Sequence, residues 1–511
     1  MIRVIFISAV IVNLSCLAQC YKILTVFPMA APSHYILGEA IARGLAEAGH
    51  DVTMVSPFEM KNPPKNGKFR DILLTGFIEE HKNHTVMNLF QMEHMNMITH
   101  NLALNFLGST STRKTLDHPN LQKLINSGEK FDAVIIEQFL NEGLKPLAEH
   151  FNAHLILFST IGPNIWVDGF VGNPSPPSYI PDWTVAYPIP MNLYQRAWNL
   201  IIKTVSYANL HLLFYPDQKR IAEEFLPKGL NFNNALYNVS LVLCNSHEST
   251  NQAVPMVPNM VQIGGFHIKT PKKLPQEFQD FMDSAKEGVV YFSLGSNIVP
   301  SMMGEEKKTA ILKAFGKLKQ KVLWKWNEDT IHGKPDNVKL AKWFPQQDLL
   351  AHPNMKLFVT HGGLLSTLET IYHGIPVLSL PVFADQRMNA ARAQEAGYGL
   401  FMPFSEITEQ RLDEALKKLL NDPKYRENAE RRSSYFRDRP IKPMDLATYW
   451  VEYVIRHKGA EHLRIAGTKL PWYQYYSVDS IALILLVLIS PYFLLKFVLS
   501  LRKKTTKSKK E

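Results

Sequence analysis

The stretch from Trp343 to Gln386 constrains this chain most, because short apolar runs alternate in it with segments of helical spacing. Lys356–Thr360 (KLFVT) has the composition of a buried parallel strand, and Leu364–Tyr372 continues with apolar residues at helical spacing. His361-Gly362-Gly363 separates the two. Two glycines let the backbone approach a ligand closely, and the free N–H groups of the following helix suit an anion. The stretch therefore predicts an anion-binding turn in an open α/β sheet.

Further polar residues stand at the junctions of the same stretch. Glu369 lies about two helical turns beyond His361, where its carboxylate can accept a hydrogen bond from a ribose hydroxyl. The strand expected at Pro376–Leu380 ends before Asp385 and Gln386, at the carboxyl edge where open α/β sheets bind ligands. A histidine before two glycines is a weak signal by itself, but here an ordered set is present: Trp343, Gln346, His361, Glu369, Asp385 and Gln386.

This set resembles the signature of the animal UDP-glycosyltransferases, a family that includes UDP-glucuronosyltransferases, and its insect-like members are the most similar. The resemblance implies contacts to uracil, diphosphate, ribose and sugar hydroxyls, made in that order by Trp343 with Gln346, by His361, by Glu369, and by Asp385 with Gln386. Vertebrate members commonly carry an Asn four residues after the histidine. Leu365 stands there in this chain, so either the hydroxyl of Ser366 or bare backbone would contact the phosphate.

The rest of the chain repeats the alternation of apolar strands and amphipathic helices. A first sheet with its helices is expected from Lys22–Phe27, His34–Ala48, Val52–Val55, Phe131–Ile136, Leu144–Phe151 and Leu155–Phe158. A second is expected from Val289–Leu294, Val322–Trp326 and Val338–Ala341, with helices at Thr408–Leu420 and Arg439–His457. The resemblance implies an α/β fold of GT-B type: two Rossmann-like, doubly wound domains facing a cleft, and a C-terminal transmembrane helix.

We expect six segments along the chain. They are a signal peptide (1–20), an N-terminal acceptor-binding domain (21–262), a C-terminal UDP-sugar-binding domain (263–440), a return helix packed across both domains with a juxtamembrane segment (441–477), a transmembrane helix (478–501) and a basic cytosolic tail (502–511). Gly162–Pro190 holds seven prolines and predicts an ordered loop without regular elements. Met191–Phe225 is helical with apolar patches, which suit either the floor for a greasy ligand or core packing. Asn259–Pro275 predicts a linker.

Apolar segments stand near both ends. Met1–Cys20 has the basic start, apolar core and small final residues of a secretory signal. Ile481–Leu501 can span about 30 Å of hydrocarbon, with aromatic residues before it and a basic tail after it. The positive-inside rule predicts a single-pass type I protein of the endoplasmic reticulum membrane, with lumenal catalytic domains. Lys507 and Lys509 resemble a dilysine retrieval signal or form a stop-transfer flank.

Composition limits the compartment and the partners. Removal of the signal leaves Cys244 alone, so no internal disulfide can form. Asn83 and Asn238 begin Asn-x-Thr/Ser sequons, which are glycosylation sites in such a compartment or chance occurrences. The net charge is +10, and half of it comes from the last eleven residues, with six Lys/Arg and one Glu. The rest lacks the aromatic–basic interleaving of nucleic-acid binders, so no nucleic-acid partner is expected.

His34 is the candidate general base. It follows the first strand at the start of the first helix, a junction that faces the cleft of a doubly wound sheet. A helix N-terminus disfavours imidazolium, so the ring is expected to stay neutral and to take a proton near pH 7. The resembled family has its base here; the alternative is that Ser33 caps the helix and His34 fills its first turn. The family's Asp partner corresponds to Glu137, which either supports His34 or is a solvated acid.

The chain has no Asp-x-Asp sequence, so the leaving group is expected to be stabilised without a metal ion. No cofactor is expected. N–H groups and hydroxyls after two strands would neutralise the departing UDP, and they belong to Ser293, Gly295, Ser296, His361, Gly363 and Ser366. The expected mechanism is direct displacement. An acceptor hydroxyl loses its proton to His34, attacks the anomeric carbon from the opposite face and inverts its configuration.

One position in the sequence indicates which sugar the UDP-sugar donor carries. Val254 stands where vertebrate glucuronosyl members carry an Arg suited to a sugar carboxylate. We therefore expect UDP-glucose as donor, with UDP-glucuronate as the alternative. The acceptor is expected to be a small lipophilic hydroxyl compound, as in detoxification or secondary-metabolite conjugation. An inactive, membrane-anchored binding protein is the alternative of another class, and the intact His34, Glu369 and Asp385 weigh against it. Homo-oligomer formation stays open.

Overall fold

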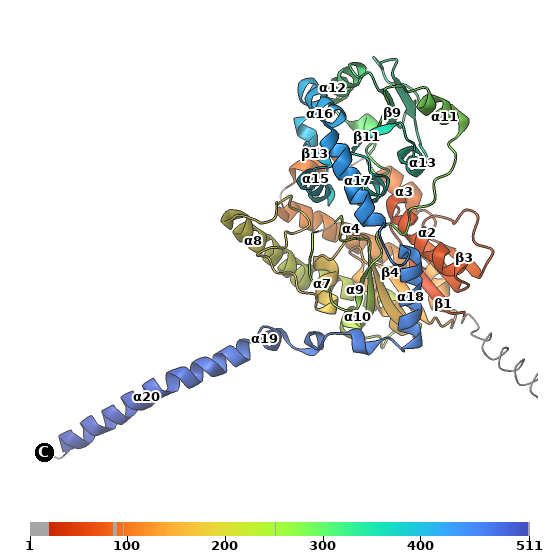
Figure 1. Ribbon diagram of the computed structural model, residues 1–511. Helices are drawn as coiled ribbons and strands as arrows, with labels where there is room; N and C mark the ends of the chain where they lie inside the picture. Colours follow the sequence, from red (N-terminus) through yellow and green to blue (C-terminus); the bar gives the residue numbers. More distant parts are fainter. Residues whose placement is uncertain (1–19, 85–88, 96, 251, 509–511) are drawn as a thin grey trace, which may run out of the picture. The chain divides into compact units, whose positions relative to one another are not determined.

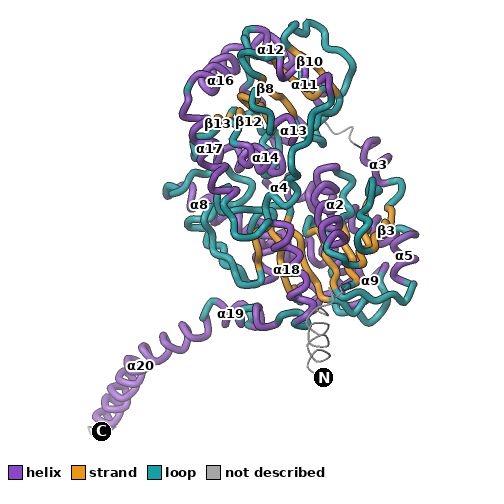
Figure 2. Tube along the Cα trace, turned by 45° about the vertical axis from the view of Figure 1, so that its right-hand side comes forward, coloured by secondary structure: helices purple, strands orange, loops and turns teal. Residues whose placement is uncertain are grey.

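The computed structural model describes residues 20–84, 89–95, 97–250 and 252–508. The chain forms two compact units, Met1–Leu463 and Arg464–Glu511. Apart from Cys20, the expected signal peptide lies outside the described residues, as do the last three residues of the tail. The first unit contains two parallel sheets, and Figure 2 shows their strands as two separate groups.

In the described part of the chain, the first sheet has seven parallel strands in the order β3-β2-β1-β4-β5-β6-β7. The strands are β1 (Lys22–Val26), β2 (Asp51–Ser56), β3 (Lys68–Leu73), β4 (Ala133–Glu137), β5 (His154–Ser159), β6 (Val239–Cys244) and β7 (Met260–Gln262). The central strands are apolar and buried along both faces, as parallel strands covered by helices require.

The second sheet, counted over the same residues, has six parallel strands in the order β10-β9-β8-β11-β12-β13. The strands are β8 (Val289–Ser293), β9 (Lys321–Lys325), β10 (Val338–Ala341), β11 (Met355–Thr360), β12 (Val377–Ser379) and β13 (Gly399–Phe401). Alternate residues of β8 enter different cores: Val290 and Phe292 pack in one cluster, and Val289 and Tyr291 in another. Helices therefore cover both faces of this sheet.

Helices connect the strands and cover the sheets, and Figure 1 places many of them. In the first part of the chain they are α2 (Pro32–Glu47), α3 (Phe77–His84), η1 (Leu89–His94), α4 (Met97–Asp117), α5 (Pro119–Ile125), η2 (Glu142–Leu144), α6 (Pro146–His150), α7 (Ile165–Val171), α8 (Leu193–Asn209), η3 (Leu210–Phe214), α9 (Tyr215–Phe225) and α10 (Phe232–Tyr237). Later they are α11 (Gln276–Asp283), η4 (Pro300–Met302), α12 (Glu305–Gly316), α13 (Gln346–Leu350), α14 (Leu364–His373), α15 (Gln386–Glu395), η5 (Phe404–Glu406), α16 (Glu409–Asn421), α17 (Pro423–Arg437), α18 (Pro443–Arg456), η6 (Glu461–Leu463), η7 (Ala466–Lys469), α19 (Trp472–Tyr475) and α20 (Val478–Ser508).

Two consecutive helices, α17 and α18, lead the chain from the second half back to the first sheet. α17 contacts α14 in the second half, whereas α18 contacts α2, β5 and β6 of the first sheet. Ala447, Val451 and Val454 of α18 belong to the same core cluster as Leu37 and Ile41 of α2. The packing across both halves expected of Arg439–His457 is thus divided between α17 and α18, and Figure 1 shows α18 beside the first sheet.

Three expectations about the first half need correction. Gly162–Pro190 contains the helix α7, which Asn164 caps by accepting from the backbone N–H of Trp166. The expected linker Asn259–Pro275 contains β7, because its short apolar run pairs with β6. Met191–Phe225 follows neither expected role throughout: Ile202, Phe214 and Ile221 are buried as core packing requires, whereas Tyr194 and Trp198 on the outer face of α8 are 85% and 50% exposed.

Of the two predicted glycosylation sites, the structure describes the side chain of one, Asn238. Asn238 is exposed at the end of α10, as a glycan requires. Asn83 belongs to α3, and its side chain lies outside what is described. Cys244 is fully buried in β6, and burial raises the pKa of its thiol.

The second unit contains α19 and α20. Val478–Ser500 within α20 is long and apolar enough to cross a membrane, and it holds the one such helix among the described residues. The span agrees with the apolar run that the sequence shows at Ile481–Leu501.

Candidate active site

The order of the strands creates a switch point in each sheet. β1 lies between β2 and β4, so the chain leaves β1 in one direction for β2 and later returns to its other side with β4. β8 lies in the same way between β9 and β11. Ligands of open α/β sheets bind at the carboxyl ends of the strands at such points. His34 follows β1, and Glu137 is the last residue of β4. In the second sheet, Gly295 follows β8 and His361 follows β11.

His34 and Glu137 form a close pair at the first switch point. Nδ1 of His34 lies 2.5 Å from Oε1 of Glu137, and the carboxylate is fully buried. The backbone carbonyl of Glu137 accepts from Nδ2 of Asn141, which fixes the end of β4. The ring of His34 meets Phe139 edge-on, with centroids 4.7 Å apart. The alternative of Glu137 as a solvated acid is therefore wrong.

The structure shows that Ser33 does not cap α2, which was the alternative role for this residue. Ala31 is the N-cap residue, and no side chain caps this helix. The hydroxyl of Ser33 accepts instead from Nδ2 of Asn297, at 3.4 Å, in the loop after β8. Ser33 thus joins the two halves of the first unit rather than capping α2.

The charge of His34 is governed by its acidic neighbours. Burial alone lowers the pKa of His34, but the charge and hydrogen bond of Glu137, with a further contribution from Asp385, raise it above its ordinary value. The expectation that the helix N-terminus keeps the ring neutral is therefore wrong in direction, because the acidic neighbours favour the protonated form. The contribution of Asp385 also shows that the predicted base and the predicted sugar contact lie near one another.

At the second switch point, glycines give room to the ring of His361. A Cβ at Gly363 would lie 2.4 Å from Nε2 of His361, and one at Gly295 would lie 2.6 Å from Cε1. Gly295 also has φ +82°, which favours glycine. Burial and the nearby Lys325 lower the pKa of His361 to about 4, so the ring is neutral at pH 7 and has one N–H to donate. The hydroxyl of Ser293 accepts from the backbone N–H of Gly295, and Ser296 is exposed beside it.

Gln346, Ser366 and Glu369 meet between α13 and α14. Nε2 of Gln346 donates to Oε2 of Glu369 at 2.6 Å and to the hydroxyl of Ser366 at 3.1 Å. Gln347 donates to the other oxygen of Glu369 at 2.9 Å. Burial nevertheless raises the pKa of Glu369 to about 7, since two amide donors offset it only in part. The predicted uracil and ribose contacts are thus neighbours.

Asp385 and Gln386 stand at the start of α15, after β12. Ala384 takes a left-handed φ of +56° immediately before them, a strained conformation typical of functional turns. Oε1 of Gln386 accepts from the backbone N–H groups of Val382 and Phe383, which folds this side chain back onto its own loop. Asn389 donates to Oδ2 of Asp385 at 2.7 Å and to the carbonyl of Gly362 at 2.9 Å, so it joins this loop to the histidine–glycine turn.

Three residues that the sequence reasoning missed also line this region. Nζ of Lys325, at the end of β9, donates to the carbonyl of Gly295 at 2.9 Å and lies 4.4 Å from the centroid of the Trp343 ring. Burial lowers the pKa of Lys325 to about 8. Nε2 of His267 lies 3.7 Å from Oε1 of Glu369, and Gln347 donates a hydrogen bond to the same carboxylate. Lys325 stands at the end of β9, where the sequence alone does not distinguish it from a solvated charge.

The described residues contain no group of three or more His, Cys, Asp or Glu side chains that could hold a metal ion. The predicted uracil-stacking residue Trp343 is 61% exposed, so a face of its ring is open to a planar ligand. Leu365, which stands where an Asn was expected, packs against the core cluster of the first half. The free backbone N–H groups at the start of α14 and the hydroxyl of Ser366 remain as donors near His361.

Comparisons with known proteins agree with this geometry. The family model described as "UDP-glucoronosyl and UDP-glucosyl transferase" matches residues 22–511. UDP-glycosyltransferase UGT5 of Dactylopius coccus is 36% identical over 491 residues, which cover 93% of this chain and 90% of that protein. UDP-glucuronosyltransferase 1A6 of Homo sapiens is 34% identical over 479 residues, covering 90% and 88% of the two chains.

Solved structures are similar in fold. TcCGT1 in complex with UDP has a TM-score of 0.58 at 14% identity, with 86% of this chain and 100% of that chain covered. A UDP-glucosyltransferase from Polygonum tinctorium has a TM-score of 0.57 at 17% identity, with 86% and 99% covered. These likenesses show the GT-B fold. From the match over nearly its whole length, the chain belongs to the UDP-glucuronosyl and UDP-glucosyl transferase family and is a UDP-glycosyltransferase.

Proposed function

We propose that this enzyme transfers glucose from UDP-glucose to the hydroxyl of a small lipophilic acceptor, with inversion at the anomeric carbon. The observation that carries the proposal is the 2.5 Å pair of His34 and Glu137 at the switch point of the first sheet. The carboxylate holds Nδ1 of His34, so Nε2 is left for a substrate. The charge of Asp385 in the second half contributes to the raised pKa of His34, which supports a base and a sugar contact in the same region.

The proton transfer follows from this pair. Glu137 accepts the N–H at Nδ1, which fixes the tautomer with a lone pair on Nε2. Nε2 takes the proton of the acceptor hydroxyl while the oxygen bonds to the anomeric carbon. The bond from that carbon to the diphosphate oxygen breaks, and its electron pair leaves with UDP. The buried carboxylate of Glu137 stabilises the imidazolium that forms.

Departing UDP gains negative charge, and the second half offers donors to it. Lys325 supplies a cation, the neutral His361 supplies an N–H, and the start of α14 supplies backbone N–H groups. Trp343 offers an open ring face to the uracil, and Glu369 accepts from the ribose. Asp385 and Gln386 contact the sugar hydroxyls in this proposal.

The choice of glucose rests on Val254, an uncharged residue in the segment between β6 and β7. The relatives include both donor classes, since one is named a UDP-glucosyltransferase and others UDP-glucuronosyltransferases. The test compares UDP-glucose with UDP-glucuronate at equal concentration on a panel of phenols, with the product's anomeric configuration read by NMR. Faster transfer from UDP-glucose with an inverted product supports the proposal. Faster transfer from UDP-glucuronate would make the enzyme a glucuronosyltransferase, and failure to bind or use either donor would favour an inactive binding protein.

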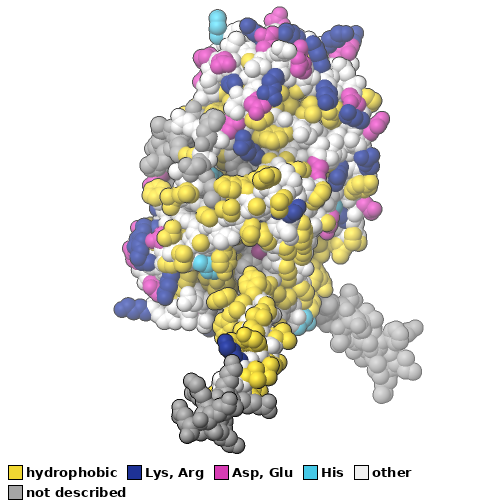
Figure 3. All heavy atoms as spheres, turned by 90° about the vertical axis from the view of Figure 1, so that its left-hand side faces the viewer, with side chains coloured by type: hydrophobic (Ala, Val, Ile, Leu, Met, Phe, Trp, Pro, Cys, Tyr) yellow, Lys and Arg dark blue, Asp and Glu magenta, His cyan; other side chains and the backbone are white. Residues whose placement is uncertain are grey.

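A membrane is part of the proposal, with α20 as a single-pass anchor in the endoplasmic reticulum and the catalytic unit in the lumen. The first unit also presents an apolar face of the kind that a bilayer covers. On α4, Phe106 is 74% and Ile98 62% exposed, and α8 adds Tyr194 and Trp198. Asn105 of α4 and Asn209 of α8 bond to each other, which holds the two helices together. Figure 3 shows hydrophobic side chains gathered on the face to which α8 belongs.

A further inference from the structure

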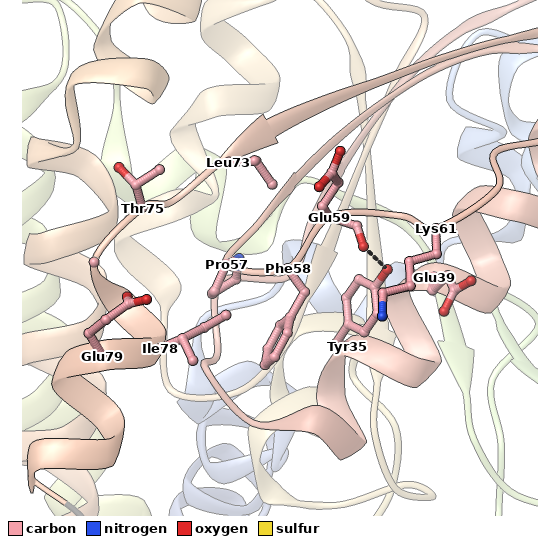
Figure 4. A pocket seen from close by; sticks show the side chains of 11 residues that line it. Tyr35, Glu39, Pro57, Phe58, Glu59, Lys61, Leu73, Thr75, Ile78 and Glu79 are labelled. Atoms are coloured by element: carbon pink, nitrogen blue, oxygen red, sulfur yellow. Dashed lines mark hydrogen bonds between the residues drawn. The ribbon is translucent and has the colours of Figure 1, made fainter. Parts of the chain in front are cut away.

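A cavity of about 590 Å³ lies at the carboxyl edge of the first sheet, beside the ends of β2 and β3. Its walls come from four segments: α2, the chain after β2, the end of β3 and the start of α3. Figure 4 shows its side chains from close by. The volume lies within the range typical of small-molecule sites. None of the site residues discussed above lines it.

The body of the cavity is aromatic and apolar. The rings of Tyr35 and Phe58 lie 4.9 Å apart at 33°, and Leu73 and Ile78 add aliphatic surface. The hydroxyl of Tyr35 donates to the carbonyl of Glu59 at 2.9 Å, which fixes the phenol and is drawn as a dashed line in Figure 4. A flat or rounded apolar group therefore meets a rigid aromatic wall.

The rim of the cavity carries more negative than positive charge. Glu39, Glu59 and Glu79 line it together with a single cation, Lys61. Glu39 is already paired with Arg43 at 2.8 Å. Glu59 and Glu79 are exposed and form no ion pair with any residue in the described ranges.

A further carboxylate lies behind this rim. Oδ1 of Asp71 is buried and has no hydrogen-bond partner among the described residues. Burial raises the pKa of Asp71, and the nearby carboxylates of Glu59 and Glu39 raise it further. The groups around the cavity thus repel one another, and an added cation would relieve that repulsion.

From this combination we infer that the cavity binds an organic cation, a quaternary or protonated amine with an apolar body. The apolar body lies against Tyr35 and Phe58, and the ammonium group faces Glu59 and Glu79. Aromatic faces and carboxylates both attract such a cation, and the aromatic contribution is largest for weakly hydrated ammonium groups. A neutral or anionic molecule of the same shape gains neither contribution.

The location suggests what this site selects, and this step rests on the proposed function. Tyr35 follows His34 directly on α2, and the ends of β1 and β2 are neighbours at one edge of the sheet. An acceptor with a hydroxyl at one end and an amine at the other can extend from His34 into the cavity. Hydroxylated amines are therefore the acceptor class that we assign to this enzyme.

The first test measures binding without any transfer. The full chain in lipid nanodiscs is titrated with benzyltrimethylammonium, and the double variant Glu59→Gln/Glu79→Gln is compared with wild type. We expect roughly 3–20-fold weaker binding in the double variant, and weaker binding of the wild type at high salt. Glu47→Gln, which removes one exposed carboxylate at the far end of α2, is the control and should bind as wild type. Absence of wild-type binding, or an equal loss in the control, would overturn the site, and neither result bears on glucose transfer.

The second test asks whether the site serves the acceptor. Hydroxyalkyl-trimethylammonium ions of increasing chain length are compared with the matching alkanediols as acceptors. At the length that spans the distance from His34 to the cavity, the ammonium compound should show the lower KM, with kcat unchanged. Glu59→Gln/Glu79→Gln should remove that advantage and leave the diols unaffected. Equal KM values at every length would show that the cavity takes no part in acceptor binding.

Discussion

Nδ1 of His34 lies 2.5 Å from Oε1 of Glu137, although 103 positions separate the two residues in the chain. Only the order of the strands brings them together, since β1 and β4 are hydrogen-bonded neighbours. Oε2 of Glu137 is buried with no hydrogen-bond partner in the part of the chain that is described, so this carboxylate serves His34 alone. Glu137 is therefore a positioning residue for the predicted base.

Replacement of Glu137 by Gln should lower activity and shift its pH dependence. Glu137 raises the pKa of His34, and the base works only when unprotonated, so the acid limb of wild-type kcat/KM should lie above the ordinary histidine pKa of about 6.5. Glu137→Gln leaves burial, which lowers the pKa, so the limb should move to lower pH while the plateau falls roughly 10²–10⁴-fold. Affinity for UDP-glucose should stay unchanged. A full-rate variant with an unmoved limb would refute this role.

Lys325 should make donor binding weaken at high pH. Its pKa of about 8 lies far below that of a free lysine because the amine is buried, and a diphosphate binds the protonated form. Affinity for UDP-glucose should therefore fall as pH rises through about 8. Lys325→Gln should weaken binding by about 10–100-fold at pH 7 and flatten this dependence. Calorimetric titration over pH measures both, and wild-type-like binding by the variant would exclude a diphosphate contact.

Glu369 should produce the opposite limb. Burial raises the pKa of this carboxyl to about 7, and its ionised form is the better acceptor for ribose hydroxyls. Affinity for UDP-glucose should then fall as pH drops through about 7, so that binding is strongest between the two limbs. Glu369→Gln should remove the acid limb only. A variant that keeps this limb would assign it to another group.

The grouping of the proposed donor residues could be predicted in part because His361, Asp385 and Gln386 each follow a strand within one short stretch of sequence. Lys325 could not, since a lysine at a strand end resembles a solvated charge until Trp343 and Gly295 are folded onto it. β3 escaped prediction because Lys68, Arg70 and Asp71 interrupt its apolar pattern, as an edge strand permits.

Exposed apolar residues explain why the helix α4 was not predicted from the sequence. On α4, Ile98 and Phe106 face outward, so the usual contrast between an apolar inner face and a polar outer face is absent. Sequence patterns report burial in the average soluble protein, and this surface departs from that average. The pairing of His34 with Glu137 was expected from the family resemblance, but its closeness depends on strand order, which no local pattern encodes.

Topology can be tested on intact microsomes. The proposed type I orientation leaves only the segment after Leu501 outside, so added protease should remove the tail and spare the catalytic unit. Detergent should then expose the whole chain, which is the control for protease activity. Digestion of the catalytic unit in intact microsomes would reverse the orientation.

The most direct measurement compares wild type with His34→Ala in the transfer of glucose to a weakly acidic aliphatic alcohol, with UDP-glucose binding measured on the same samples. An acidic phenol ionises without help, whereas an aliphatic alcohol needs the base. The account predicts a rate roughly 10²–10⁴-fold lower in His34→Ala, with UDP-glucose affinity nearly unchanged, because the donor contacts lie in the second half. A variant that keeps most of its rate on the alcohol would contradict the account.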